Sequence, residues 1–341
     1  MASTDHIEVL AMTHERDFAI MLREAFENAI ATIETNVVTS MVDDIDANHI
    51  REQLGIGLNM NGGLPGHLAE SEEAAAALVI SLAAAVAAHA AAKVGHSANP
   101  KDALLVAAQH DAAQLVRTFY ADTATALAQA IETAIYGSGN PAWRAPQLRR
   151  SIGLTVKQAA SLELMRSTLH QYVTAPLKVI GARVGPDGVR IPPAVVRNID
   201  TRRLLSATRG HLSAAQHQLL TKALGNPKLT LAQAKEILDN HADALRDHRV
   251  RAVAGELIHN VTESAKLTGW RIAQRAGALS SDQRRYWKTA GDERVRHPHA
   301  QVPAMNPGGV PLNKPFKTPL GDHFIPPLEY GCRCKSVLVR P

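Results

Sequence analysis

Residues 287–301 read WKTAGDERVRHPHAQ and residues 324–339 read FIPPLEYGCRCKSVLV, and these two stretches decide how the C-terminal part of the chain is expected to fold. A passage rich in proline and glycine joins them. The only two cysteines of the 341 residues, Cys332 and Cys334, lie in the second stretch. His297, His299 and His323 precede them, so residue types that bind metals gather in one short part of the chain.

The spacing of these residues favours a zinc site. Side chains alternate along an extended strand, so Cys332 and Cys334 are predicted to share a face, as are His297 and His299 if their segment is extended. Two thiolates and one or two imidazoles can complete a tetrahedral zinc site. The candidate zinc ligands are therefore His299, Cys332, Cys334 and His323.

Two other interpretations of the cysteines stay open from the sequence. Both can be small buried residues of a final strand, with the histidines at turns, or one can be a catalytic thiol. A disulfide between Cys332 and Cys334 is disfavoured, because an extended i, i+2 pair places its Cα atoms near or beyond the limit of about 7 Å.

The same stretches resemble the C-terminal domain of phage Mu F-like head morphogenesis proteins, which are minor head proteins of tailed phages. The resemblance covers about the last third of the chain. It is carried by a combination of residues in a fixed order: Thr262, Glu263, Ser264, Ala265, Trp287, Asp292, Glu293, Arg294, Val295, Arg296, His299, Pro315, Phe316, Pro326, Pro327, Cys332, Arg333 and Cys334. His323 stands where the family has a histidine before its Pro-Pro pair, with one extra residue between.

The resemblance implies a structural protein and no catalysed reaction. A minor head protein would lie inside the virion head near the portal, after assembly in the host cytoplasm, and would assist head morphogenesis, DNA packaging or ejection. Its expected partners are the portal or the major capsid protein, packaged double-stranded DNA bound without sequence preference, and further copies of itself.

Two alternatives from other classes remain. One is a metal-dependent enzyme or toxin-like domain that uses Asp292, His299, Cys332 and Cys334. The other is a non-specific DNA-binding module. The chain has no P-loop, dinucleotide-binding glycine motif, nucleophile elbow or H-E-x-x-H motif, so the sequence assigns no catalytic or cofactor-binding residue.

Composition favours a mainly α-helical fold. Apolar residues make up 45 % of the chain, aromatic residues only 4 %, and alanine is abundant. We expect an acidic helical arm with a Gly-rich hinge over residues 1–66, a helical body over 67–230, and a small α+β domain over 231–341. In this last domain a long helix from about residue 242 would pack on a short sheet containing residues 332–339.

Charge is distributed unevenly along the chain. Residues 1–100 carry 4 Lys and Arg against 14 Asp and Glu, a net charge of −10, whereas residues 101–341 carry 33 against 18, a net charge of +15. A basic body joined to an acidic arm indicates a nucleic acid or another acidic surface near the basic part.

The N-terminal helix carries apolar residues at helical spacing, among them Phe18, Leu22 and Phe26. This stripe could belong to an ordinary core helix or could dock on a partner protein. A second short helix near 41–54 and the Gly-rich hinge after it are expected to follow.

Residues 74–92, AAAALVISLAAAVAAHAAA, carry no formal charge. The length would allow a membrane span, but alanine dominates and His89 interrupts the run, so a buried helix capped by Ser71 is expected and membrane contact is not.

Further along, residues 155–179 are predicted to be helical, and residues 181–193, GARVGPDGVRIPP, to form a hairpin-like or looped connector. Capping boxes at Ser213-x-x-Gln216 and Thr230-x-x-Gln233 predict two helix starts. Ser280-x-x-Gln283 predicts a third, opening a short helix that ends near Trp287.

Overall fold

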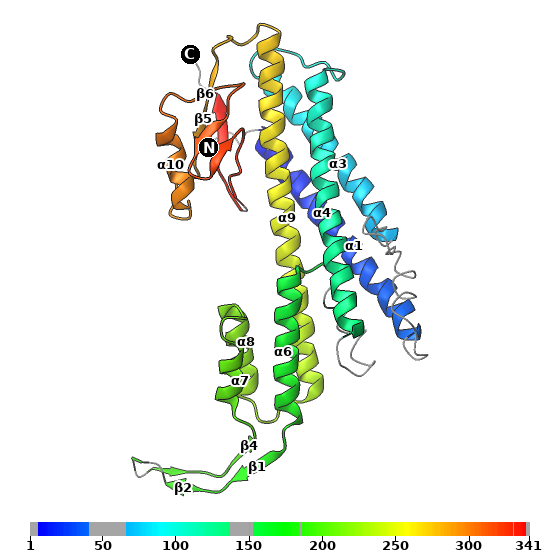
Figure 1. Ribbon diagram of the computed structural model, residues 1–341, viewed down its shortest axis with the longest axis vertical. Helices are drawn as coiled ribbons and strands as arrows, with labels where there is room; N and C mark the ends of the chain where they lie inside the picture. Colours follow the sequence, from blue (N-terminus) through cyan, green and yellow to red (C-terminus); the bar gives the residue numbers. More distant parts are fainter. Residues whose placement is uncertain are drawn as a thin grey trace. The chain divides into compact units, whose positions relative to one another are not determined.

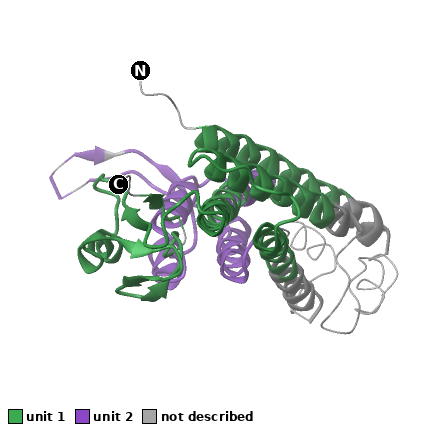
Figure 2. Cartoon of the chain, turned by 90° about the horizontal axis from the view of Figure 1, so that it is seen from above, with its two compact units in different colours: residues 1–31, 51–124, 248–341 green, residues 32–50, 125–247 purple. Residues whose placement is uncertain are grey.

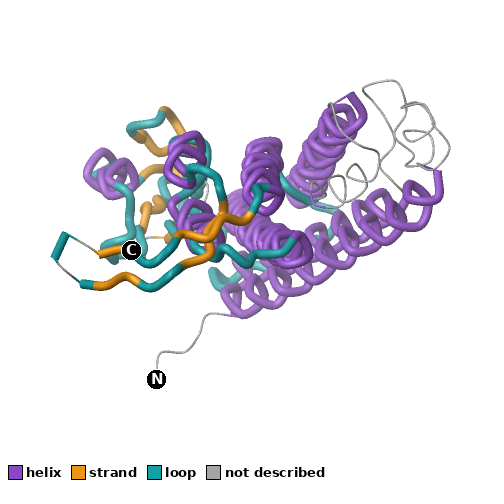
Figure 3. Tube along the Cα trace, turned by 90° about the horizontal axis from the view of Figure 1, so that it is seen from below, coloured by secondary structure: helices purple, strands orange, loops and turns teal. Residues whose placement is uncertain are grey.

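The structure, a computed structural model, describes residues 6–40, 66–136, 150, 153–184, 186–187, 189–329 and 331–338. The expected helix near 41–54 and the Gly-rich hinge lie outside these residues. The predicted fold class, mainly α with a small α+β region at the C-terminus, is confirmed (Figure 3).

The described helices are α1 (His6–Ser40), α3 (Gly66–Ala92), α4 (Ala103–Tyr136), α6 (Val156–Thr174), α7 (Thr201–Thr208), α8 (Ala214–Leu224), α9 (Leu231–Arg275) and α10 (His297–Met305). The described strands are β1 (Leu177–Ile180), β2 (Arg183–Val184), β3 (Arg190–Ile191), β4 (Ala194–Arg197), β5 (Arg284–Lys288), β6 (Val310–Pro311), β7 (Phe316–Thr318), β8 (Gly321–His323) and β9 (Lys335–Leu338). Strands therefore occur in the C-terminal region and in one connector.

The chain divides into two compact units, shown in different colours in Figure 2. Unit 1 comprises residues 1–31, 51–124 and 248–341, and unit 2 comprises residues 32–50 and 125–247. These units are not the three consecutive segments expected from the sequence. The difference arises because the 45-residue helix α9 continues across the boundary at residue 247, and because N-terminal helices cluster with the C-terminal domain.

The apolar stripe of α1 is buried within the protein. Phe18 and Leu22 are completely buried and Phe26 is 2 % exposed. An apolar stripe looks the same in a sequence whether it packs on its own chain or on a partner. The stripe therefore belongs to the core of unit 1, and these side chains are not exposed to dock on a partner.

Helix α3 packs its apolar residues into unit 1, since Val79, Leu82 and Val86 are completely buried. Within the described residues, Ser71–Ala92 is long and apolar enough to cross a membrane by length and composition, and 44 % of that stretch is buried. Ser71 is not the helix cap expected from the sequence. The helix begins earlier, and the Ser71 hydroxyl instead forms a buried 2.6 Å hydrogen bond with the Tyr120 hydroxyl of α4.

Gly269 lets α9 approach α3 closely. A Cβ atom at this position would lie 2.3 Å from the Ala87 carbonyl oxygen. We expect Gly269→Ala to lower the free energy of unfolding by about 1–3 kcal/mol, because the two backbones must separate. Gly255→Ala on the same helix is the control. Its Cβ would meet only the flexible Glu15 side chain at 3.4 Å, so better helix propensity should stabilise the protein by up to about 1 kcal/mol. Urea unfolding followed by circular dichroism measures both, and equal effects would contradict the close-packing account.

Unit 2 has its own core, formed by α6, α8 and the first half of α9. Its buried residues include Leu162, Met165, Leu169, Tyr172, Leu220, Leu224 and Leu238. The capping box at Ser213 and Gln216 is confirmed, and the reciprocal hydrogen bonds at Thr230 and Gln233 are also present. The connector is a hairpin, one of the two forms expected, but α6 ends at Thr174 and leaves residues 177–180 to strand β1.

The C-terminal domain contains a three-stranded antiparallel sheet in the order β6-β5-β9. The prediction of a short helix ending near Trp287 is wrong, because residues 284–288 form strand β5. Arg285 and Trp287 point inward, whereas Arg284, Tyr286 and Lys288 are exposed. This alternation is the pattern of a half-buried strand, and tertiary packing overrides the capping signal at Ser280.

Candidate metal centre

Helix α10 places His299 inside the C-terminal domain. His299 is 3 % exposed, whereas His297 is exposed. A shared face for His297 and His299 was predicted only for an extended segment, and the segment is instead helical from His297, with Pro298 in the first turn, where a missing N–H is harmless. Residues two apart on a helix point in different directions. The two histidines therefore do not share a face, and only His299 reaches the centre.

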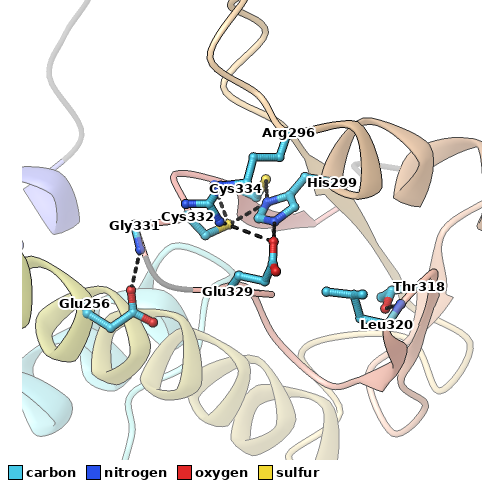
Figure 4. Close-up of polar contacts among 9 residues, drawn as sticks. All are labelled: Glu256, Arg296, His299, Thr318, Leu320, Glu329, Gly331, Cys332 and Cys334. Carbon is cyan, nitrogen blue, oxygen red and sulfur yellow. Dashed lines mark hydrogen bonds and ion pairs between the residues drawn. The ribbon is translucent and has the colours of Figure 1, made fainter. Parts of the chain in front are cut away.

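Cys332 and Cys334 lie in the turn that leads into β9. Both are buried and both thiols are free. Gly331 adopts a positive φ of 69°, and its N–H donates a 2.9 Å hydrogen bond to the Glu256 carboxylate on α9. The turn is thereby fixed to the long helix, as Figure 4 shows.

His299 faces both thiols through one ring nitrogen. Nδ1 lies 3.3 Å from the Cys332 Sγ and 3.7 Å from the Cys334 Sγ. Zinc bonds of about 2.3 Å to sulfur and about 2.0 Å to nitrogen, at the tetrahedral angle, separate the two ligand atoms by about 3.5 Å. The three ligand atoms all lie within 4.8 Å of one another. This buried group could therefore hold a metal ion such as zinc.

Glu329 orients the histidine from the opposite side. Its Oε2 lies 3.1 Å from His299 Nε2, and Arg296 Nη1 lies 3.3 Å from the same oxygen (Figure 4). The hydrogen bond from His299 and the Arg296 guanidinium hold the pKa of Glu329 below its usual range. In the tautomer that carries its proton on Nε2, His299 donates a hydrogen bond to this carboxylate. Nδ1 then presents a lone pair to the thiols, as a metal ligand must.

The two thiols differ strongly in acidity. The pKa of Cys332 is lowered to about 5, first because its sulfur accepts a hydrogen bond from Cys334, and further because backbone N–H groups of Leu328 and Cys334 and the nearby His299 favour the thiolate. The hydrogen bond to Cys332 and burial raise the pKa of Cys334. One thiolate is therefore available near neutral pH, and thiolates are the form that binds metals.

His323 does not belong to this group. It lies on β8 with Phe316 of β7 as its cross-strand partner. The β7–β8 hairpin fixes this register, and the described residues bring only His299, Cys332 and Cys334 together. His323 is therefore removed from the candidate ligand set.

Asp292 contacts Arg333 and not His299. Its carboxylate accepts two hydrogen bonds from the Arg333 guanidinium, at 2.7 and 2.8 Å, and it also accepts one from the Arg294 N–H. These contacts lower the pKa of Asp292, with the Arg333 hydrogen bond as the largest cause. The enzyme alternative would use Asp292 together with His299, but the carboxylate beside His299 belongs to Glu329.

The remaining residues of the family motif support the same domain. Trp287 packs edge to face on Phe316 in a core that includes both cysteines, with ring centroids 5.3 Å apart. Glu263 is 2 % exposed and accepts hydrogen bonds from the Ser336 N–H and hydroxyl, at 2.8 and 2.6 Å. Thr262 beside it is buried, whereas Arg294 is exposed.

A small cavity of about 20 Å³ adjoins the three ligands. Its lining includes Arg294, Arg296 and Arg333. This volume is enough for one water molecule or one ion. Since the described chain contributes three ligands to a metal that prefers four, a water molecule or another small ligand would complete the coordination.

Sequence reasoning missed Glu329 and the Asp292–Arg333 pair. Glu329 lies three residues before Cys332, and an acidic residue so close to a predicted ligand is a usable signal, because carboxylates often orient metal-binding histidines. The partner of Asp292 had no comparable signal, since 41 residues separate it from Arg333.

No family model, curated protein or solved structure matches the chain.

Proposed function

We propose that this chain is a minor head protein of a tailed phage, with a C-terminal domain stabilised by one zinc ion on His299, Cys332 and Cys334. The role is structural. The protein lies inside the head near the portal, contacts the portal or the major capsid protein, and assists assembly and the packaging or ejection of DNA.

The observation that supports the proposal is that the residues of the motif contact one another. Trp287, Cys332 and Cys334 belong to one buried cluster. His299 contacts both cysteines, and Asp292 pairs with Arg333. Residues that resembled a family only by chance would have no reason to lie together in one domain. These contacts give a physical reason for the order and spacing of the motif residues in this chain.

A three-ligand site favours a second candidate, a metal-dependent hydrolase, because catalytic zinc sites keep one position for water. The Glu329 carboxylate already pairs with His299 and Arg296, and Asp292 already pairs with Arg333. A general base facing the cavity is therefore missing among the described residues of the centre, which makes the structural role the stronger proposal.

Incorporation into heads tests the first proposal. The tagged chain is expressed together with the portal and major capsid proteins of a phage that carries it, and purified heads and tails are probed separately. We expect the chain in heads at low copy number and not in tails. Its exclusion from heads would overturn the proposed function.

Incubating the purified protein with DNA, RNA and zinc tests the second candidate function, a metal-dependent hydrolase. Turnover of a nucleic acid by the natural protein, lost in His299→Ala and retained in His297→Ala, would establish the hydrolase. We expect no turnover above that of His299→Ala.

A further inference from the structure

Residues 177–197 form a two-stranded antiparallel ribbon, here called the β-ribbon. Strand β1 pairs with β4 from Leu177↔Arg197 to Ile180↔Ala194, and β2 pairs with β3 nearer the turn. Figure 1 shows the ribbon extending away from the ends of α6 and α7 within unit 2.

The β-ribbon exposes several aliphatic side chains. The exposed fractions are 55 % for Leu177, 69 % for Val179, 70 % for Val184, 59 % for Val189 and 39 % for Val195. A two-stranded hairpin is only marginally stable by itself, and exposed strand edges are normally covered or charged. These features indicate a surface that a partner covers.

The charges of the β-ribbon indicate which partner. Lys178, Arg183 and Arg190 are exposed on its strands. The one acidic residue between positions 177 and 197 is Asp187, which lies at the turn, where its carboxylate accepts a hydrogen bond from the Val189 N–H. The strands themselves therefore carry positive charge and no acidic residue, which complements a polyanion.

Arg197 has a different role. Its guanidinium donates hydrogen bonds of 2.8 and 3.0 Å to the carbonyl oxygens of Ala175 and Leu229. It fixes the base of the β-ribbon to the helical part of unit 2. The ribbon is thereby anchored at one end, while the three other cations stay exposed along its length.

Double-stranded DNA fits this surface. Paired strands lie about 4.8 Å apart, and a two-stranded ribbon enters a major groove about 12 Å wide. Cations on both strands then reach phosphates, which carry no sequence information. Asp187 would repel the DNA at the turn, so the contact must involve the sides of the ribbon.

We propose that the β-ribbon is a DNA-binding element that holds double-stranded DNA through phosphate contacts of Lys178, Arg183 and Arg190, without base-sequence readout. The proposal deepens the proposed function, because it names the element that would contact packaged DNA. It also stands apart from head incorporation, since the purified chain can be tested for it directly.

The test measures binding of the full chain to a 30-base-pair duplex, at about 50 to 200 mM salt, by fluorescence anisotropy. The variant is Lys178→Gln, Arg183→Gln and Arg190→Gln together. Each lost phosphate contact should lower the slope of log affinity against log salt by about 0.9, so the triple variant should lose about 2.7 from the slope and at least about tenfold in affinity at 50 mM salt.

The matched control removes three exposed lysines from the C-terminal domain, Lys288→Gln, Lys314→Gln and Lys317→Gln. The net charge changes equally, so an effect of overall charge would be the same in both variants. We expect the control to keep the slope of the natural protein. Unchanged circular dichroism shows that each variant folds.

A second measurement needs no substitution. Trypsin cleaves after Arg183 and Arg190, and saturating duplex should slow both cleavages several-fold relative to sites in the C-terminal domain, as quantified by mass spectrometry. Failure of the natural protein to bind the duplex, equal losses in both triple variants, or cleavage unaffected by DNA would each overturn the proposal. Light scattering without DNA tests the alternative that the β-ribbon binds a second copy of the chain. A dimer that the ribbon variant abolishes would support that alternative and overturn the DNA-binding proposal.

Discussion

Full-length protein from cells grown with zinc is expected to carry about one zinc equivalent per chain, and the His299→Ala variant less than about a tenth of that. The imidazole Nδ1 lies 3.3 and 3.7 Å from the two sulfurs, so its removal leaves only two thiolates for a metal that prefers four ligands. Elemental analysis of the purified protein measures the ratio. The thiols of the natural protein should also resist alkylation until a chelator is added.

The chain supplies two matched controls for this experiment. His297→Ala removes an exposed histidine of the same helix, and His323→Ala removes the histidine that the β7–β8 hairpin holds outside the group. Both variants should keep their zinc. Zinc at less than about a tenth of an equivalent in the natural protein would contradict the metal site and leave both cysteines as residues of a packed core.

Loss of the Glu263 carboxylate is expected to have the largest effect on stability. Glu263 accepts hydrogen bonds from the Ser336 N–H and hydroxyl, and it pairs with buried Lys266. Glu263→Ala should lower the free energy of unfolding by about 3–5 kcal/mol, because it leaves a buried ammonium without its partner. Urea unfolding of the full chain, followed by tryptophan fluorescence, measures the change.

A control and a double variant separate burial from charge. Glu163 and Arg166 form a pair of the same spacing on α6, with the Glu163 side chain 34 % exposed, and Glu163→Ala should cost about 1 kcal/mol or less. Replacing Glu263 with Leu and Lys266 with Met together should recover most of the loss, since apolar residues can replace a buried ion pair. Equal effects of Glu263→Ala and Glu163→Ala would contradict the role assigned to burial.

The metal centre was partly predictable because it uses both of the chain's only two cysteines. Two cysteines in 341 residues, two positions apart and preceded by histidines, are visible in the sequence. His299, Cys332 and Cys334 are brought together as that pattern predicts. The tertiary structure decided that His299 belongs to the centre and His323 does not, because α10 carries the first and the β7–β8 hairpin holds the second away. It also decided that Glu329, and not Asp292, is the carboxylate beside His299.

The sequence by itself determined the mainly helical class, the turn residues of the connector at 181–193 and the helix starts after Ser213 and Thr230, whereas the long helix expected from about residue 242 is continuous from Leu231. These features depend on local chemistry: alanine content, turn residues and hydrogen bonds between side chains and backbone three residues away. Tertiary structure alone decided that the stripe of α1 is core, that residues 284–288 form a strand, and that the compact units combine distant segments. Burial depends on which surfaces meet across the chain, and the same apolar pattern serves an internal contact or a partner equally well.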